Sequence, residues 1–407
     1  MKQENEQAEY KGQPPCTEDG LACFRISELP YLRVLGRTNG CLDPLTLFWT
    51  ASGLEISVRA KELWVRVRAD YEQFEPWLDI VVDGALMQRR MLAKGEQEIC
   101  VFRQMEPDRV RTVRILRDTP AMPQDEWTLL QILSVRTDGS FCPAPEYAMR
   151  LEFIGDSITS GEGGAGAVGE MTWNSGCFDC VNHYTFWTAE ALNAEYQVIS
   201  QSGWGVYCSW QGRREQAIPP YYEQVCGLLC GEQNRSLGAM EPWNFARWQP
   251  DVVIVNLGTN DAGSFSFGGV TDPLTGFVGP MRSNSDGSMY EEDRQAIEDA
   301  AYQFLKQLRR CHPDSYILWC YGMMGDALAE TLRHAVSRCK TESGDTRMEY
   351  FPLPDTPKEQ LGSREHPGHE AHRHVSELLA EKIRALLPSG FSCILHESTS
   401  RDSGCGE

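Results

Sequence analysis

Ser157 lies in a segment whose composition suits a nucleophile. In RLEFIGDSITSGEG (150–163), an apolar run ends in a glycine-containing turn, and the serine follows at once. A strand that leads into such a turn presents a reactive side chain at the carboxyl edge of a sheet. If a helix begins there, the N–H groups of its first turn point outward and can stabilise an oxyanion. The segment therefore indicates acyl-transfer chemistry with Ser157 as the nucleophile.

Two later turns could supply further donors for that oxyanion. The stretch VISQSGWGVY (198–207) ends an apolar run in a Gly-x-Gly turn, where the missing Cβ atoms let a backbone N–H approach a substrate oxygen closely. We expect Gly205 to be this donor, with Gly203 as the alternative. The stretch DVVIVNLGTND (251–261) places Asn260 just beyond another apolar run, and its side-chain amide could donate as well.

His366 is the expected general base. A serine hydroxyl is a weak nucleophile at neutral pH, so acyl transfer needs a base within hydrogen-bond reach. In SREHPGHEAHRHVSELLAEKI (363–383), His366 precedes a proline at the entry of an amphipathic helix. A loop at that point could direct the imidazole at the serine. With the two donors, the set of groups needed to hydrolyse an ester is complete.

The elements that must position these residues divide the chain in two. From about 30 to 136, short alternating apolar runs separated by turn residues predict the antiparallel strands of a β-sandwich or jelly roll. After residue 148, apolar runs alternate with helix-length stretches, which predicts an α/β domain with a parallel sheet flanked by helices. The predicted division is a polar tail (1–28), an all-β domain (29–136), a linker (137–148), an α/β domain (149–390) and a disordered tail (391–407).

Four short motifs in this order resemble a known superfamily. GDSIT, SGWG, GTND and HP are similar to the ordered blocks of the SGNH (GDSL) hydrolases, over roughly residues 148 to 388. The resemblance implies a flavodoxin-like hydrolase domain. It also implies roles for four residues: nucleophile, two oxyanion donors and base fall on Ser157, Gly205, Asn260 and His366.

The whole chain is similar to a narrower group within that superfamily. The β-rich region before the hydrolase domain, the phrase LEFIGDSITSGEG and the segment NHYTFWTAEALNAEYQVIS together resemble carbohydrate esterase family 2. That resemblance implies an N-terminal jelly roll and an acetylesterase acting on acetylated oligosaccharides from plant hemicellulose, such as mannan and xylan pieces. We expect no metal or organic cofactor, because side chains and dipoles carry acyl transfer. The alternatives are an SGNH lipase or thioesterase acting on longer acyl groups, and a non-catalytic glycan-binding protein.

One position departs from the superfamily pattern. Most SGNH hydrolases have an aspartate three residues before the histidine, and here that position is Ser363. The aspartate normally fixes the tautomer of the imidazole and stabilises the imidazolium. We therefore expect a Ser–His dyad, with either a backbone carbonyl or one of three acidic residues orienting the histidine: Glu365, Asp355 or Glu359.

Composition narrows the functions further. The formal net charge of −20 over 407 residues disfavours nucleic acids and anionic membranes as partners. The N-terminal residues are polar, and no run of about eighteen apolar residues occurs, so we expect a soluble cytoplasmic protein. The odd number of cysteines, 15, favours reduced thiols over a disulfide framework. The sequence does not predict the oligomeric state.

Two patterns resemble metal sites, and neither is favoured. The histidine-rich segment after residue 365 fails the H-E-x-x-H motif, because Arg373 stands where the second histidine is required. A loosely zinc-like spacing is formed by Cys177, Cys180, His183, Cys226 and Cys230. We expect free thiols there, since a closed zinc site would need these segments to converge.

Aromatic residues surround the predicted oxyanion turn. Trp204 lies between the two candidate glycines, and we expect it to line the acyl or sugar pocket, with core packing as the alternative. Tyr207 and Trp210 follow this turn closely in the sequence, and Trp173 lies further upstream. The glycine- and serine-rich segment 263–289 is long enough to be a cleft wall or lid, or else to be disordered.

Overall fold

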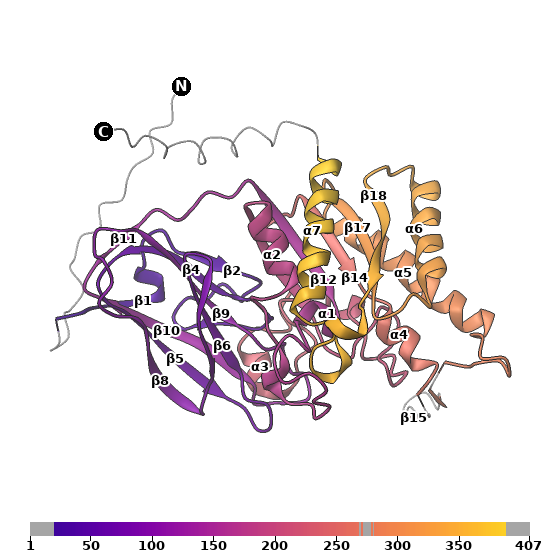
Figure 1. Cartoon of the computed structure of the whole chain (residues 1–407), viewed down its shortest axis with the longest axis horizontal. Coiled ribbons are helices and arrows are strands. Elements are labelled where there is room, and N and C mark those ends of the chain that lie inside the picture. The colour runs from indigo at the N-terminus through magenta and orange to yellow at the C-terminus, as the bar shows by residue number, and fades with distance from the viewer. Residues whose placement is uncertain (1–19, 268–269, 272–277, 280, 388–407) are drawn as a thin grey trace.

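Alternating apolar residues fold the N-terminal part of the chain into two antiparallel sheets that share one core (Figure 1). The computed structural model describes residues 20–267, 270–271, 278–279 and 281–387. In β5 (Leu63–Asp70), every second residue from Leu63 to Ala69 is buried, while Arg66 and Arg68 are exposed. This is the period of two expected for a strand with one face on the core.

The strands of the two sheets come from the whole N-terminal region. The first sheet contains β1 (Ala22–Arg25), β10 (Leu129–Thr137), β5, β8 (Gly95–Phe102) and β3 (Leu45–Thr46). The second sheet contains β11 (Ser140–Cys142), β4 (Gly53–Arg59), β9 (Arg111–Arg117), β6 (Trp77–Val82), β7 (Ala85–Met91) and β2 (Arg33–Leu35).

Two boundaries differ from the sequence-based division. The predicted tail (1–28) contains β1, which pairs with β10 from Ala22↔Thr137 onward. The predicted linker (137–148) contains β11, which pairs with β4. Both strands have only three or four residues, too few for an alternating pattern to be visible in the sequence. The predicted C-terminal tail and residues 1–19 lie outside the described residues.

The second part of the chain forms a parallel sheet in the order β13-β12-β14-β17-β18. Numbered along the chain, this order is 2-1-3-4-5, the flavodoxin-like arrangement. The strands are β12 (Met149–Gly155), β13 (Ala194–Ser200), β14 (Val252–Asn256), β17 (Tyr316–Met323) and β18 (Met348–Asp355). The predicted fold class, a parallel α/β domain preceded by antiparallel β-sheets, is confirmed.

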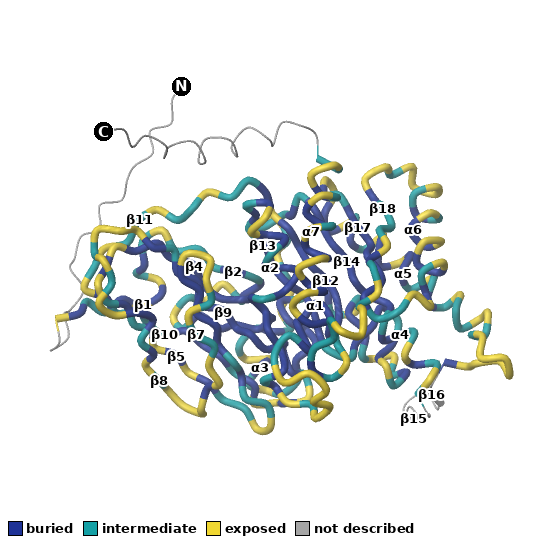
Figure 2. The backbone as a smooth tube through the Cα atoms, viewed as in Figure 1, coloured by how far each residue is buried: buried dark blue, intermediate teal, exposed yellow. Residues whose placement is uncertain are grey.

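Helices cover both faces of the parallel sheet, as Figure 1 shows. In β14, Val253 and Val255 belong to one core with α5 (Glu291–Cys311) and α6 (Ala329–Ser343). The alternate residues Val252 and Ile254 belong to a second core with α2 (Tyr184–Ala191) and α7 (His369–Leu386). A strand buried on both faces accounts for the unbroken apolar run VVIV. Figure 2 shows the buried strands between helices whose outer sides are exposed.

The remaining elements are short. Three further α-helices are α1 (Ser157–Ser160), α3 (Gly231–Ser236) and α4 (Thr259–Ser264), and a small hairpin is formed by β15 (Val270–Thr271) and β16 (Val278–Gly279). Single 3₁₀ turns occupy Ile26–Glu28, Ser175–Cys177, Pro219–Tyr221, Phe245–Arg247, Lys358–Gln360 and Ser363–Glu365. Within the described ranges, no helix has the length and apolar character that crossing a bilayer requires.

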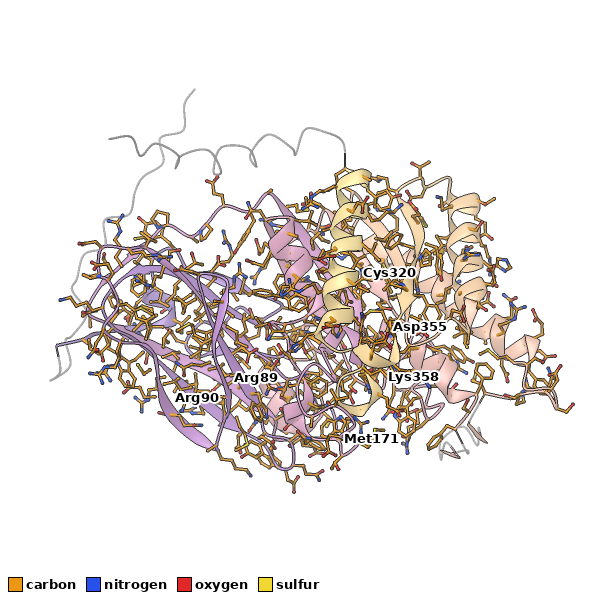
Figure 3. The ribbon with its side chains drawn as sticks, in the orientation of Figure 1. Arg89, Arg90, Met171, Cys320, Asp355 and Lys358 are labelled. Atoms are coloured by element: carbon orange, nitrogen blue, oxygen red, sulfur yellow. The ribbon has the colours of Figure 1, made fainter. Side chains whose placement is uncertain are left out.

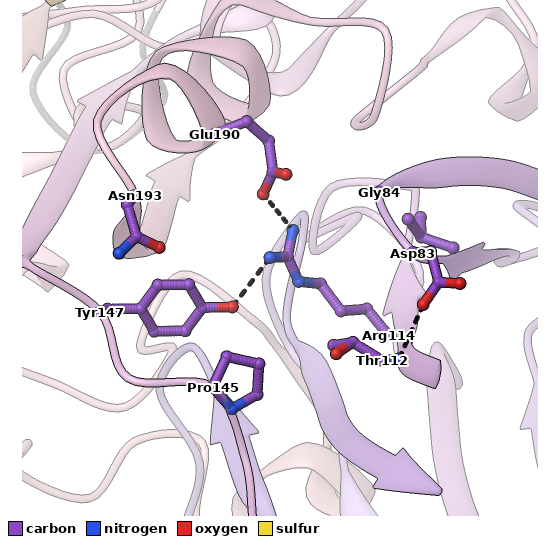
Figure 4. A pocket seen from close by; sticks show the side chains of 9 residues that line it. Asp83, Gly84, Thr112, Arg114, Pro145, Tyr147, Glu190 and Asn193 are labelled. Atoms are coloured by element: carbon purple, nitrogen blue, oxygen red, sulfur yellow. Dashed lines mark hydrogen bonds and ion pairs between the residues drawn. The ribbon is translucent and has the colours of Figure 1, made fainter. Parts of the chain in front are cut away.

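Arg114 of β9 joins the two parts of the chain at one end of their contact (Figure 4). Its Nη1 donates to Glu190 of α2 at 2.7 Å, and its Nη2 donates to the hydroxyl of Tyr147 at 2.8 Å. Its Nε donates to the buried carboxylate of Glu55 at 2.8 Å. A pocket opens beside these residues. Tyr147 and Asn193 of its lining precede β12 and β13, so this pocket lies near the amino edge of the parallel sheet, away from Ser157.

A second contact places a charged residue of the N-terminal part inside the α/β core. Arg37 is fully buried, and its Nη2 donates to Glu152 of β12 at 2.9 Å. The Tyr222 hydroxyl also donates to this carboxylate, and His312 contacts it at 3.1 Å. Burial opposes ionisation of Glu152, but Arg37 and His312 outweigh it and lower the pKa of the carboxyl to about 2.

Replacing Glu152 by glutamine should lower the free energy of unfolding at pH 7 by about 3–5 kcal/mol, because it leaves Arg37 buried without a counter-charge. In the native protein, the ionised carboxylate stabilises the fold above its unfolded pKa of 4.5, and this contribution is lost as the pH falls towards 2. The variant should therefore lose less stability than wild type between pH 5 and 3. Urea unfolding at several pH values measures both effects. Glu232→Gln, in an exposed pair with Arg235, is the control, and an equal effect of the two substitutions would contradict the prediction.

Candidate active site

The predicted catalytic residues lie on four loops that follow the carboxyl ends of parallel strands. Ser157 begins α1 after β12, and Asn260 lies in α4 after β14. The Gly-x-Gly turn follows β13, and His366 lies between β18 and α7. Strands β12 and β14 are neighbours on either side of the point where the chain order reverses, which is where open α/β sheets form binding crevices.

The structure brings Ser157 and His366 within hydrogen-bond distance. The Nε2 atom of His366 lies 3.0 Å from Oγ of Ser157, although 209 residues separate them in the chain. The other ring nitrogen, Nδ1, lies 2.9 Å from the backbone carbonyl of Arg364. Because a carbonyl only accepts hydrogen bonds, Nδ1 must carry a proton, and Nε2 of the neutral ring is then free to accept the serine proton.

No carboxylate contacts the imidazole of His366 in the described part of the chain. Of the three acidic candidates, Asp355 accepts the N–H of Gly325 at 3.0 Å, and Glu359 and Glu365 are exposed. Figure 3 labels Asp355 at the end of β18. The carbonyl of Arg364 occupies the orienting position instead, which was one of the alternatives left open by the sequence. A carbonyl can be supplied by any residue type, so the sequence could not identify it.

The turn that carries Ser157 is fixed by buried polar groups. The carboxylate of Asp156 accepts the N–H of Ile158 at 3.0 Å and so caps α1. A Cβ at Gly155 would lie 1.9 Å from Oγ1 of Thr159, so only glycine allows this strand-to-helix turn. Nε2 of His183 lies 2.7 Å from the carbonyl of Ile158, and burial lowers the pKa of His183 to about 4, so the neutral ring donates there.

Asn260 lies beside Ser157 on the neighbouring loop. Its Nδ2 donates to Oδ2 of Asp156 at 3.2 Å and to the carbonyl of Trp204 at 3.0 Å. Both amide hydrogens are thus directed at acceptors. To donate to an oxyanion, the amide must share one of these hydrogens between its present acceptor and the oxyanion. The bond to Asp156 is the longer of the two. Burial raises the pKa of Asp156 to about 7, and protonation would weaken its carboxyl as an acceptor for this amide.

The two candidate glycines occupy different environments. A Cβ at Gly205 would lie 2.2 Å from Oδ2 of Asp261, and the carbonyl of Gly205 accepts the N–H of Ile218. This packing explains the glycine without any role in catalysis. Gly203 is partly exposed and has a left-handed φ of +81°, which glycine adopts without strain. Of the two candidate oxyanion donors, Gly203 is therefore the more exposed.

Asp261 was missed by the sequence-based prediction, although it follows Asn260 directly. Its buried carboxylate accepts the backbone N–H groups of three consecutive residues at 2.8–2.9 Å: Val206, Tyr207 and Cys208. These bonds hold the segment after the Gly-x-Gly turn against α4. The aspartate of the GTND motif was the available signal, since a carboxylate at the start of a helix commonly accepts loop N–H groups.

Trp204, expected in the acyl or sugar pocket, takes the alternative place that the sequence left open, packed in the core. Its side chain is 4% exposed and packs in the core beside Tyr221, with ring centroids 5.5 Å apart. Trp210, by contrast, is 46% exposed, and its backbone N–H donates to the carbonyl of Gly203. The side chain of Trp210 also packs edge-on against Phe267 at 4.7 Å. The exposed aromatic face beside the oxyanion turn therefore belongs to Trp210. The rest of segment 263–289 lies partly outside the described residues.

The cysteines with zinc-like spacing do not converge. Cys226 lies in the core with α5, whereas Cys180 lies in the core with α2. In the described ranges, the group whose atoms are close enough to hold a metal ion is Asp79, Asp118 and Cys180. Arg89, labelled in Figure 3, donates to Asp118 at 2.9 Å and supplies a positive charge there. Burial and the charge of Asp118 raise the pKa of Asp79 well above its usual value, so a proton on that carboxyl balances the charge of the group.

Comparisons with known proteins agree with this geometry. The model of the GDSL-like lipase/acylhydrolase family matches residues 153–381. The structure of an acetyl xylan esterase from the rumen bacterium Butyrivibrio proteoclasticus is 39% identical, with a TM-score of 0.88, over 90% of this chain and 98% of that one. An acetylxylan esterase / glucomannan deacetylase of Cellvibrio japonicus (strain Ueda107) is 24% identical over 88% of this chain and 89% of its own length. A family two carbohydrate esterase from Clostridium thermocellum, solved with cellohexaose, shares the fold at 22% identity, with a TM-score of 0.70 over 88% of this chain and 100% of that one.

Proposed function

Because the chain belongs to the GDSL-like lipase/acylhydrolase family, whose members are also called SGNH hydrolases, we propose that it is a carbohydrate esterase that removes O-acetyl groups. The observation that carries this proposal is the contact of 3.0 Å between Nε2 of His366 and Oγ of Ser157. A neutral imidazole held through Nδ1 is the arrangement that a serine nucleophile needs.

The proposed reaction has two halves. Nε2 of His366 takes the proton of Ser157, and Oγ attacks the acetyl carbon, which places a negative charge on the carbonyl oxygen. The backbone N–H groups of Ser157 and Gly203 and the amide of Asn260 stabilise that charge. The imidazolium then protonates the departing sugar oxygen, which leaves an acetyl-enzyme. In the second half, water gives a proton to His366 and attacks the ester, and acetate leaves as Oγ recovers its proton.

The substrate class follows from relatives that cover both parts of the chain. One of these relatives is named an acetyl xylan esterase, and another an acetylxylan esterase / glucomannan deacetylase. We therefore propose acetylated xylo- and manno-oligosaccharides as substrates. The test is to incubate the protein with a mixture of both and to follow the loss of acetyl groups from each oligosaccharide by mass spectrometry. Faster cleavage of aryl octanoate than of aryl acetate would instead identify a lipase or thioesterase, and sugar binding without acetate release would identify a glycan-binding protein.

Trp210 offers a test of where the sugar lies. If its exposed ring stacks on the sugar, Trp210→Ala should raise KM for acetylated oligosaccharides by about 3- to 10-fold, which corresponds to roughly 0.5–1.5 kcal/mol for one aromatic contact. The kcat/KM for 4-nitrophenyl acetate, which has no sugar, should change by less than about 2-fold. Trp127→Ala is the matched control, because Trp127 is 52% exposed and its carbonyl contacts α3 rather than the turn of Gly203. An equal loss on both substrates would show that Trp210 only braces that turn.

A further inference from the structure

Glu162 is a buried carboxylate beside the proposed nucleophile that the reaction described above does not use. It is 1% exposed and lies just after α1, with its backbone N–H donating to the carbonyl of Ser157 at 3.0 Å. Its Oε1 accepts a hydrogen bond from Nε of Arg364 at 2.7 Å, and its Oε2 accepts one from the hydroxyl of Ser202. One carboxylate therefore joins the loop of the nucleophile, the loop of the base and the turn that contains Gly203.

Arg364 is held in an unusual backbone conformation by its own contacts. Its φ is +58°, and that of Glu365 is +56°, a left-handed region that residues with side chains seldom adopt. Its Nη1 donates to the carbonyl of Met171 at 2.8 Å, and its backbone N–H donates to the carbonyl of Glu170 at 2.6 Å. These bonds, together with the ion pair to Glu162, stabilise two consecutive left-handed residues directly before the base.

This conformation directs a carbonyl at the base. The carbonyl of Arg364 accepts the Nδ1 proton of His366 at 2.9 Å. A continuous chain of contacts thus runs from Glu162 through the Arg364 guanidinium and backbone to His366 and on to Ser157. Most SGNH hydrolases place a carboxylate against Nδ1. Here the buried negative charge is that of Glu162, and Arg364 lies between it and the imidazole.

We propose that Glu162 and Arg364 are positioning residues that together replace the third member of the catalytic triad. Arg364 aims the carbonyl that fixes the tautomer of His366, and Glu162 both anchors Arg364 and balances its charge when the imidazolium forms. Through Ser202, Glu162 also fixes the turn that supplies the oxyanion donor. This inference rests on the proposed function for the identity of the base and the nucleophile.

The pH dependence of the reaction distinguishes a positioning role of Glu162 from a purely structural one. If Glu162 loses its charge, the Arg364 cation faces the imidazolium without compensation, and formation of the imidazolium becomes less favourable. The other charged or titratable groups around this loop are Asp156, Asp179, Glu365, His369 and His372. The charge of Glu162 contributes to the raised pKa of Asp156, so its loss lowers the pKa of Asp156 as well. A shift in the pH dependence of the reaction therefore reports on the charge of Glu162 and not on folding.

The test compares Glu162→Gln with a matched ion pair at the opposite edge of the sheet. Nε of Arg309 donates to Asp345 at 2.6 Å and its Nη1 donates to backbone carbonyls, as in the Arg364 pair, with similarly limited exposure. We expect Glu162→Gln to lower kcat for acetylated oligosaccharides by about 10- to 100-fold with KM within about 2-fold. The acid limb of kcat/KM should move to lower pH by about half a unit or more. Asp345→Asn should leave kcat and the pH profile unchanged.

A second readout separates this inference from the proposed function. A fluorophosphonate labels an activated serine without needing a sugar, so the rate at which it labels Ser157 should fall by a similar factor in Glu162→Gln, and Glu162→Asp should restore part of it. If wild type labels rapidly but releases no acetate from sugars, the proposed substrate is wrong and the inference stands. Unchanged labelling and an unchanged pH profile in folded Glu162→Gln would overturn the inference. A loss of activity that parallels the fall in melting temperature, with an unchanged pH profile, would also overturn the inference.

Discussion

Ser157→Ala should release acetate from acetylated oligosaccharides at least about 10⁴-fold more slowly than wild type while remaining folded. The hydroxyl of Ser157 lies 3.0 Å from Nε2 of His366. The neighbouring hydroxyls in α1 form hydrogen bonds to other groups. The Thr159 hydroxyl is paired with Tyr184 at 2.8 Å, and that of Ser160 donates to Ser200 at 2.9 Å. No neighbouring side chain in α1 is therefore free to replace the lost nucleophile.

The same experiment should show that nucleophile and base act as one unit. His366→Ala should lose nearly as much activity as Ser157→Ala, and the double variant should lose little more than either, because each group is ineffective without the other. Ser376→Ala removes another buried serine, in α7, whose hydroxyl donates to the carbonyl of Arg373, and it serves as the control. Acetate release by Ser157→Ala within about tenfold of wild type would rule out this serine as the nucleophile.

The sequence was most informative where strands end. Each of the four motifs follows a buried strand or precedes an amphipathic helix, and parallel strands bring their carboxyl ends to one edge. The proximity of Ser157 and His366 could therefore be predicted from patterns 209 residues apart. The strand order of the sheet follows from the family resemblance, and both family and fold class are confirmed.

The sequence was least informative where backbone geometry decides. Nothing in the residue type of Arg364 indicates that its carbonyl accepts the Nδ1 proton, because that contact depends on two left-handed residues in succession. The different surroundings of Gly203 and Gly205 depend on the Asp261 carboxylate, which lies against Gly205 from another loop. The position of Trp204 between both glycines predicts a place in the pocket, yet neighbouring residues of a turn point in different directions. Its ring enters the core, whereas the exposed ring belongs to Trp210.

The second large effect is expected at Asn260. Asn260→Ala should lower kcat by about 100- to 1000-fold, the usual cost of removing one donor from an oxyanion hole, with a smaller change in KM. The structure gives this residue a second task, because its Nδ2 also donates to Asp156 and to the carbonyl of Trp204. Loss of those bonds should destabilise the fold by about 1–2 kcal/mol. Steady-state kinetics and urea unfolding measure the two effects separately.

Asn234 allows the two tasks to be told apart. It is 1% exposed, lies in α3, and its Nδ2 donates to the carbonyls of Cys230 at 2.8 Å and Glu126 at 3.3 Å. Asn234→Ala should therefore lose stability by a similar amount and keep its kcat. If Asn260 served only to brace Asp156 and Trp204, the two alanine variants would lose stability and activity in the same proportion. A selective loss of kcat in Asn260→Ala is the result that requires donation to the transition state, since only an interaction made there lowers kcat without weakening substrate binding.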